Sequence, residues 1–156
     1  MTKTDLSDIY RSYVACLNAQ DWPKLGQFVA ANVSHNSRQI ALSGYRAMLE
    51  QDFRDIPDLH FNIEVLVSDA PDVASRLAFD CSPKATFLGL PVNGKRLAFA
   101  ENVFYEFQGS RVWMDARKNR CLRRGAPHLC LSALGRLESN PRSLGAPEQR
   151  SLFPWP

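Results

Sequence analysis

The sequence lacks the features of membrane-inserted, secreted and metal-binding chains. None of its apolar runs approaches the roughly 20 residues that a membrane-spanning helix needs. The N-terminal segment MTKTDLSDIYRSY contains no apolar stretch of the signal-peptide type, so we expect a cytoplasmic protein that does not bind membranes. The four cysteines form no C-x-x-C pair, which favours free thiols and gives no sign of a bound metal.

Short catalytic motifs and a nucleic-acid signature are missing as well. The chain has no glycine-rich phosphate loop, no G-x-S-x-G and no H-E-x-x-H, so no local motif indicates nucleotide binding, serine hydrolysis or zinc-dependent proteolysis. The net charge of +3 comes from the C-terminal stretch, because residues 117–156 hold eight basic and two acidic side chains. This difference of +6 leaves residues 1–116 at −3, a mildly acidic body that indicates no nucleic-acid partner.

The spacing of apolar residues predicts three helices in the first part of the chain. Apolar positions recur with a helical period over residues 5–20, which predicts an amphipathic helix. Asp21-Trp22-Pro23 predicts the start of a short second helix that ends near residue 32, because proline is favoured in a first turn. A third helix is predicted from residue 43 and ends at Pro57.

After the third helix the apolar period changes to two, which predicts strands. The first strand covers residues 60–69, and its apolar side chains are predicted to share one face: Phe61, Ile63, Val65 and Val67. Further extended segments are predicted at residues 72–82, 84–89 and 95–107, and a fifth strand begins at residue 111.

Helices followed by strands indicate an α+β domain over residues 1–115. We expect the three helices to close over a curved, mainly antiparallel sheet and to form a cone with an internal pocket. Residues 116–156 are rich in Arg, Pro, Ser and Leu and follow neither period. They are predicted to form an irregular, basic tail.

Six segments of the sequence carry a family resemblance: VSHNS (33–37), GYRAMLEQDF (44–53), IPDLHF (56–61), SRLAFD (75–80), FLGLPVNGKRLAF (87–99) and NVFYEF (102–107). In this order they resemble the SnoaL-like polyketide cyclase and ester cyclase family of the nuclear-transport-factor-2-like superfamily. The resemblance covers roughly residues 5–113. It implies a conical α+β barrel whose pocket lies between the long helix and the sheet, and a homodimer formed through the open sheet face.

The resemblance also implies a chemistry. Family members use the pocket for acid–base catalysis on small, hydrophobic carbonyl compounds, and the cyclases close a ring by an intramolecular aldol reaction with neither a metal nor an organic cofactor. We therefore expect a cofactor-free enzyme of cyclase or isomerase type. A non-catalytic domain that binds a small ligand, and an inactive family member with an aberrant C-terminus, remain open as alternatives.

Three residues are candidates for the catalytic acid–base groups: His35, Glu101 and Asp115. Glu101 interrupts the apolar run of the longest predicted strand, where it either lines the pocket or faces solvent or a dimer interface. The resemblance implies that His35 reaches the pocket together with Asn36; otherwise it is a loop histidine that hydrogen-bonds locally. Asp115, with Trp113, stands where the family has its acid–base Asp, although the fifth strand is predicted to be short here.

Candidates for substrate binding are Asn36, Arg76, Asp80, Phe104, Tyr105 and Trp113. Arg76 and Asp80 share a predicted strand face, where they form either an ordinary salt bridge or a charged pair at the pocket wall. Tyr105 lies on the same side of the predicted strand as Glu101, and Phe104 lies on the opposite side.

Overall fold

Three helical segments precede most of the sheet. The computed structural model describes residues 3–122, and its helices are α1 (Lys3–Asn18), the 3-10 turn η1 (Trp22–Lys24) with α2 (Leu25–Phe28), and α3 (Ala41–Asp55). The strands are β1 (Val29–His35), β2 (Arg38–Gln39), β3 (Asn62–Asp69), β4 (Asp72–Cys81), β5 (Thr86–Phe87), β6 (Leu90–Pro91), β7 (Leu97–Gln108) and β8 (Arg111–Leu122). The predicted second helix is shorter than expected, because the chain turns into β1 at Val29.

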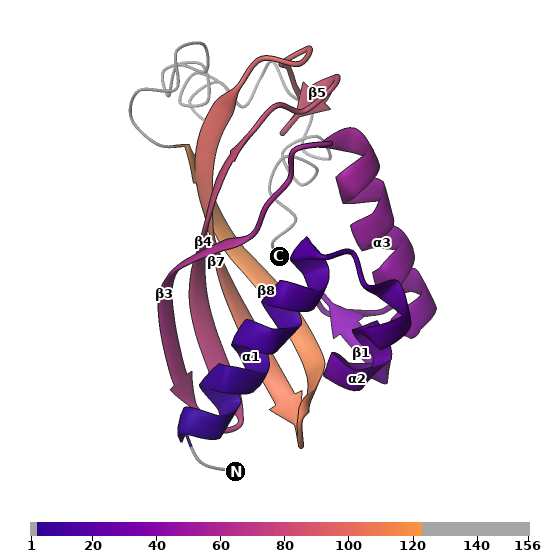
Figure 1. Ribbon diagram of the computed structural model, residues 1–156, viewed down its shortest axis with the longest axis vertical. Helices are drawn as coiled ribbons and strands as arrows, with labels where there is room; N and C mark the ends of the chain where they lie inside the picture. The colour runs from indigo at the N-terminus through magenta and orange to yellow at the C-terminus, as the bar shows by residue number, and fades with distance from the viewer. Residues whose placement is uncertain (1–2, 123–156) are drawn as a thin grey trace, which may run out of the picture.

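Six of the strands form one mixed, mainly antiparallel sheet in the order β2-β1-β8-β7-β4-β3. Only β1 and β8 of this sheet run parallel, and their pairing brings the N-terminal part of the chain beside the last described strand. Figure 1 shows the long strands curving, with α1 and α3 against the same side of the sheet. The predicted α+β fold, helices closed over a curved sheet, is confirmed.

The strand β3 departs from the predicted alternation. Its register against β4 shifts between Ile63 and Val65, which inserts an extra residue into β3. Because side chains alternate with a period of two, one extra residue moves the following positions to the other face. Val65 and Val67 are consequently half exposed, whereas Phe61 is buried, so the prediction that these residues share a face was wrong.

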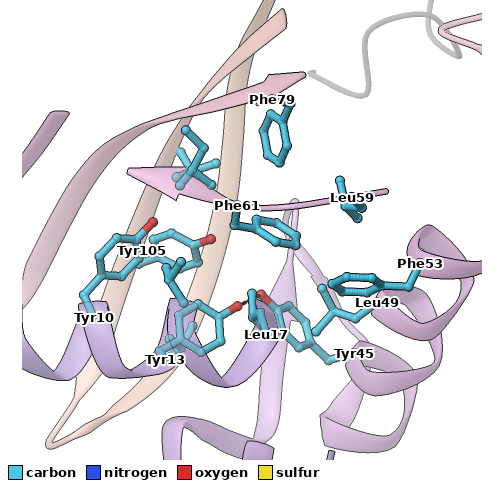
Figure 2. Close-up of a cluster of buried hydrophobic side chains, with 14 of the residues drawn as sticks. Tyr10, Tyr13, Leu17, Tyr45, Leu49, Phe53, Leu59, Phe61, Phe79 and Tyr105 are labelled. Carbon is cyan, nitrogen blue, oxygen red and sulfur yellow. Dashed lines mark hydrogen bonds between the residues drawn. The ribbon is translucent and has the colours of Figure 1, made fainter. Parts of the chain in front are cut away.

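The core lies between the helices and the inner face of β4 and β7. The apolar face of α1 is buried against the sheet, and Tyr10 and Tyr13 place their rings 5.2 and 5.9 Å from the ring of Tyr105. The hydroxyls of Tyr13 and Tyr45 lie 2.7 Å apart in a buried hydrogen bond that joins α1 to α3 (Figure 2). This bond ties the two helices that cover the sheet to each other.

Polar links fix where α1 and α3 end relative to the strands. The side-chain amide of Asn18 donates to the carbonyl of Phe61 and accepts from its N–H, at 3.0 and 2.8 Å. Past the end of α3, the N–H of Lys84 donates to the carbonyl of Asp55 at 2.9 Å. The end of α3 is therefore anchored to the segment that leads into the β5–β6 hairpin.

The last described strand is longer than predicted. β8 continues to Leu122, beyond the domain boundary expected at residue 115, and it pairs with β7 as far as Leu122 opposite Phe99. The remainder of the predicted tail, residues 123–156, lies outside the described residues. β8 therefore forms a complete central strand of the sheet.

The buried tyrosine pair makes the packing of the two helices testable. Tyr13→Phe or Tyr45→Phe should each lower the free energy of unfolding by about 1 kcal/mol, the net value of a typical internal hydrogen bond. The double variant should lose less than the sum of the two, because both changes remove the same bond. Urea denaturation of the four proteins measures these values; strictly additive losses would mean that the shared bond does not stabilise the fold.

Candidate active site

Glu101 faces the inside of the fold. Along β7 the odd-numbered positions are buried, and Glu101 lies among them with only 2% of its surface exposed. Its neighbours on the same face are Phe99 and Val103, both buried, whereas Asn102 is on the other side of the strand. The structure thus realises the first of the two predicted arrangements, in which Glu101 points inward.

Glu101 lines a cavity of about 140 Å³ between the end of α3 and the sheet. Two aliphatic side chains, Ile56 and Leu59, form part of the wall. Two further carboxylates, Asp52 and Asp55, come from the last turn of α3. Among the described residues that line this cavity none is basic, so this part of its wall carries more negative than positive groups.

Four phenylalanines complete the wall of the cavity: Phe61, Phe79, Phe87 and Phe99. Their rings are in contact one after another, at centroid distances of 5.3, 4.7 and 4.5 Å along the series Phe61, Phe79, Phe99, Phe87. Phe53 of α3 extends the series, 6.0 Å from Phe61. Figure 2 shows Phe61 and Phe79 on the sheet side and Phe53 on α3. Aromatic pairs in this range stabilise one another, so the wall is well packed.

His35, Asp115 and Tyr105 form a second group. His35 lies at the end of β1, where its backbone is the register partner of Asp115 in β8, and Asp115 is also the partner of Tyr105 in β7. The Nε2 of His35 is 3.0 Å from the side-chain amide of Asn36, and its ring packs edge-on against Tyr45 at 6.2 Å. The structure therefore brings four of the predicted site residues, His35, Asn36, Tyr105 and Asp115, to one end of the sheet.

The two groups lie at different levels of the sheet. Tyr105 and Glu101 are four residues apart on one strand, which separates their backbones by about 13 Å at the usual rise per residue. The register places Glu101 opposite Leu77 of β4 and Arg120 of β8 rather than opposite Asp115. The backbones of His35 and Asp115 therefore lie at a different level of the sheet from the backbone of Glu101.

Other predicted binding residues lie on the outer face of the sheet. Arg76 pairs with Glu64 at 2.8 Å, and Asp80 pairs with Arg96 at 2.7 Å, all with exposed side chains. The hydrogen bond from Arg96 holds the pKa of Asp80 below its usual range. Arg76 and Asp80 thus share a face, as predicted, but each takes a partner other than the residue expected.

Two aromatic candidates also lie away from the cavity. Phe104 is 47% exposed on the outer face of β7. Trp113 is half-buried at a register shift in β8, where Phe107 pairs with Val112 but Glu106 pairs with Met114. Neither residue is among those that line the 140 Å³ cavity.

The buried cysteines offer no nucleophile. Burial raises the pKa of Cys81 to about 12, so its thiol stays protonated near neutral pH. Burial also raises the pKa of Cys16, whose Sγ donates to the carbonyl of Asp21 at 3.3 Å. Over residues 3–122, no three His, Cys, Asp or Glu side chains come together as potential metal ligands.

Sequence reasoning missed most of the cavity wall. Asp52, Asp55 and Phe87 are not among the site residues predicted from the sequence, although they line the cavity together with Glu101. The available signal was the glycine-containing segment FLGLPVNG, in which Leu88 and Gly89, both with positive φ, form the turn between β5 and β6. That signal locates the hairpin in the sequence but not its position over α3.

A family comparison bears on these observations. A model of the SnoaL-like polyketide cyclase family matches residues 7–115. The chain belongs to this family. The resemblance stated from the sequence is confirmed, and membership supports a function of cyclase or isomerase type.

Solved structures extend the comparison. A SnoaL-like polyketide cyclase from Agrobacterium tumefaciens is 49% identical, with a TM-score of 0.73, and the match covers 81% of this chain and 95% of that one. TsrD from Streptomyces laurentii is 16% identical with a TM-score of 0.66, covering 76% and 90%. IdmH from Streptomyces antibioticus is 15% identical with a TM-score of 0.64, covering 83% and 97%. At these lower identities the two Streptomyces proteins show the fold alone.

Curated proteins and the helices of the structure add two negative findings. No protein of curated function matches this chain. Within residues 3–122, no helix combines the length and the apolar character that crossing a bilayer requires.

Proposed function

We propose that the protein is a cofactor-free enzyme that uses Glu101 as a general base on a small, hydrophobic carbonyl compound bound in the 140 Å³ cavity. The observation that carries this proposal is the position of Glu101. Its side chain is only 2% exposed, and it lines a cavity together with four phenylalanines. Membership in the SnoaL-like family supports the same class of chemistry.

The proposed reaction begins with proton removal. The carboxylate of Glu101 takes a proton from the carbon next to the carbonyl, and the electron pair of that C–H bond moves onto the carbonyl oxygen as an enolate. The enolate carbon then bonds to a second carbonyl carbon of the same molecule, whose oxygen receives the proton from Glu101. The product is a ring closed by an intramolecular aldol step.

The aromatic wall contributes position rather than charge. Phe61, Phe79 and Phe99 hold an apolar substrate beside Glu101, and orientation of the reacting groups lowers the barrier. They also limit the access of water, which would otherwise hydrogen-bond the carboxylate and the carbonyl. The backbones of His35 and Asp115 lie beside Tyr105, four residues along β7 from Glu101. We therefore assign the initial proton removal to Glu101 alone.

Proton removal can be measured without knowledge of the natural substrate. Acetophenone in D₂O should exchange its methyl protons faster with the protein than without it, as followed by proton NMR. Glu101→Gln, which keeps the shape of the side chain, should lower this exchange rate by about 10²-fold or more, the usual contribution of a general base. Binding of acetophenone should change little, because the aromatic wall remains.

Glu106→Gln is the matched control, because Glu106 lies on the same strand but on its outer face. It should exchange protons at the wild-type rate. Full exchange by Glu101→Gln would contradict the proposal, and so would a loss confined to Asp115→Asn or His35→Gln.

A second candidate function is a non-catalytic domain that binds a small ligand. It is favoured by the described part of the cavity wall, which contains no hydroxyl, amide or basic side chain to stabilise an enolate. The same experiment separates the two candidates. Acetophenone that binds to the wild-type protein with no acceleration of exchange would support the binding domain.

We also propose that the protein is a homodimer that associates through the outer face of the sheet. Three apolar side chains are exposed there: Val65 at 50%, Val67 at 53% and Phe104 at 47%. A cluster of large exposed apolar groups on one face is typical of an association surface. The family resemblance points to the same face.

Light scattering coupled to size-exclusion chromatography tests the dimer. Val67→Lys combined with Phe104→Lys should convert a dimer to a monomer, because it buries two like charges in the same interface. Gln27→Lys, which adds a charge on α2 away from the outer sheet face, should leave the mass unchanged. A wild-type monomer at high concentration would refute the dimer.

A further inference from the structure

Phe87 stands apart from the other aromatic residues of the cavity wall. The rings of Phe61, Phe79 and Phe99 come from the main sheet and its approach, whereas Phe87 is carried by the separate two-stranded sheet of β5 and β6. Phe87 is 8% exposed, and its ring lies 4.5 Å from that of Phe99. Figure 1 shows this hairpin beyond the end of α3.

The hairpin is held in place by local bonds. Its approach is fixed to α3 by the bond from Lys84 to Asp55, and the N–H groups of Val92 and Asn93 donate to the carbonyl of Ala85, each at 2.9 Å. Within the two-residue turn, Leu88 takes a φ of 51°, which costs a leucine roughly 1–2 kcal/mol. These hydrogen bonds thus hold Phe87 over the cavity although Leu88, the next residue, takes an unfavourable backbone conformation.

The volume of the cavity limits what can fit beneath Phe87. A cavity of about 150 Å³ accepts benzene, so the 140 Å³ of this cavity, which is partly open to solvent, holds about one six-membered ring. Glu101 and Phe99 are two residues apart on one face of β7, which places them about 7 Å from each other. Because the ring of Phe87 lies against that of Phe99, Phe87 bounds the cavity on the side where Phe99 lies.

We propose that Phe87 is a specificity-determining residue that restricts the ligands of this cavity to compounds with a single ring or its equivalent in size. This inference deepens the proposed function, because it concerns the same cavity. It does not require that the bound compound react. A smaller side chain at position 87 should open the cavity toward the hairpin and admit a second fused ring.

Two ketones that differ by one fused ring test this limit: acetophenone and 2-acetonaphthone. Isothermal titration should show that the wild-type protein binds acetophenone at least about tenfold more tightly than 2-acetonaphthone, a difference of 1.4 kcal/mol. Phe87→Ala should reverse the order, because the removed ring leaves room for the second ring of the larger ketone. Phe87→Trp should weaken the binding of acetophenone by a similar factor, because the larger side chain fills the cavity.

Phe107→Ala is the matched control. Phe107 is a buried residue on the same face of β7, but it does not line the cavity, so its loss tests whether general loosening of the core alters selectivity. Thermal melts monitored by circular dichroism establish which variants fold. If Phe87→Ala does not fold, the affinity of the Phe87→Trp variant for acetophenone still tests whether the side chain at position 87 limits the size of the ligand.

The outcomes separate this inference from the proposed function. Equal affinity of the wild-type protein for the two ketones, no binding of acetophenone, or the same reversal in Phe107→Ala would overturn the role of Phe87. Selective binding with no proton exchange would support Phe87 as the size limit and refute Glu101 as the base.

Discussion

The alternation of side chains along β7 is the constraint on which the rest of the structure depends. Successive residues of a strand point to opposite faces, so the burial of Phe99, Val103 and Tyr105 also commits Glu101 to the interior. No local preference of glutamate would place it there, since a buried carboxylate costs free energy. The register of β7 with β4 and β8 imposes this position, and nearly every residue of β7 takes part in that register.

The apolar groups around Glu101 come from segments far apart in the sequence. Ile56 and Leu59 follow α3, and Phe61 directly precedes β3. Phe79 lies near the end of β4, and Phe87 belongs to the β5–β6 hairpin. Their mutual ring contacts form a wall that extends from α3 to the hairpin. A cavity bounded by such a wall selects ligands by size and apolar character, and of the three carboxylates that line it, Glu101 is the one on the sheet. The two proposed roles rest on this geometry: Phe87 limits the size of the ligand, and Glu101 transfers the proton.

Much of the fold could be predicted from the sequence, because it rests on periodicity. The helix of residues 5–20, the third helix ending before Pro57 and the long strand after the Asn93-Gly94 turn all follow from local patterns. The family resemblance supplied the overall architecture. The side of β3 on which Val65 and Val67 lie could not be predicted, because the extra residue in that strand is defined only by its pairing with β4. The length of β8 escaped prediction for a related reason: residues 116–122 are polar and basic, and their strand conformation depends on β7 as a partner.

The candidate site was less predictable than the fold. The choice between Glu101 and Asn102 as the inward residue could be framed from the sequence, but only the pairing of β7 decided it. Arg76 and Asp80 were correctly placed on one face, yet their partners Glu64 and Arg96 come from β3 and from the turn before β7. The separation of Glu101 from His35 and Asp115 likewise depends on the register of three strands, which no local pattern encodes.

The central claim is that chemistry takes place beside Glu101, inside the aromatic wall. A crystal structure of the Glu101→Gln protein soaked with acetophenone tests it most directly. The account predicts that the ring lies among Phe61, Phe79 and Phe99, with the methyl carbon against the side chain at position 101. A ketone bound instead beside His35 and Tyr105, with the cavity at position 101 left empty, would contradict it.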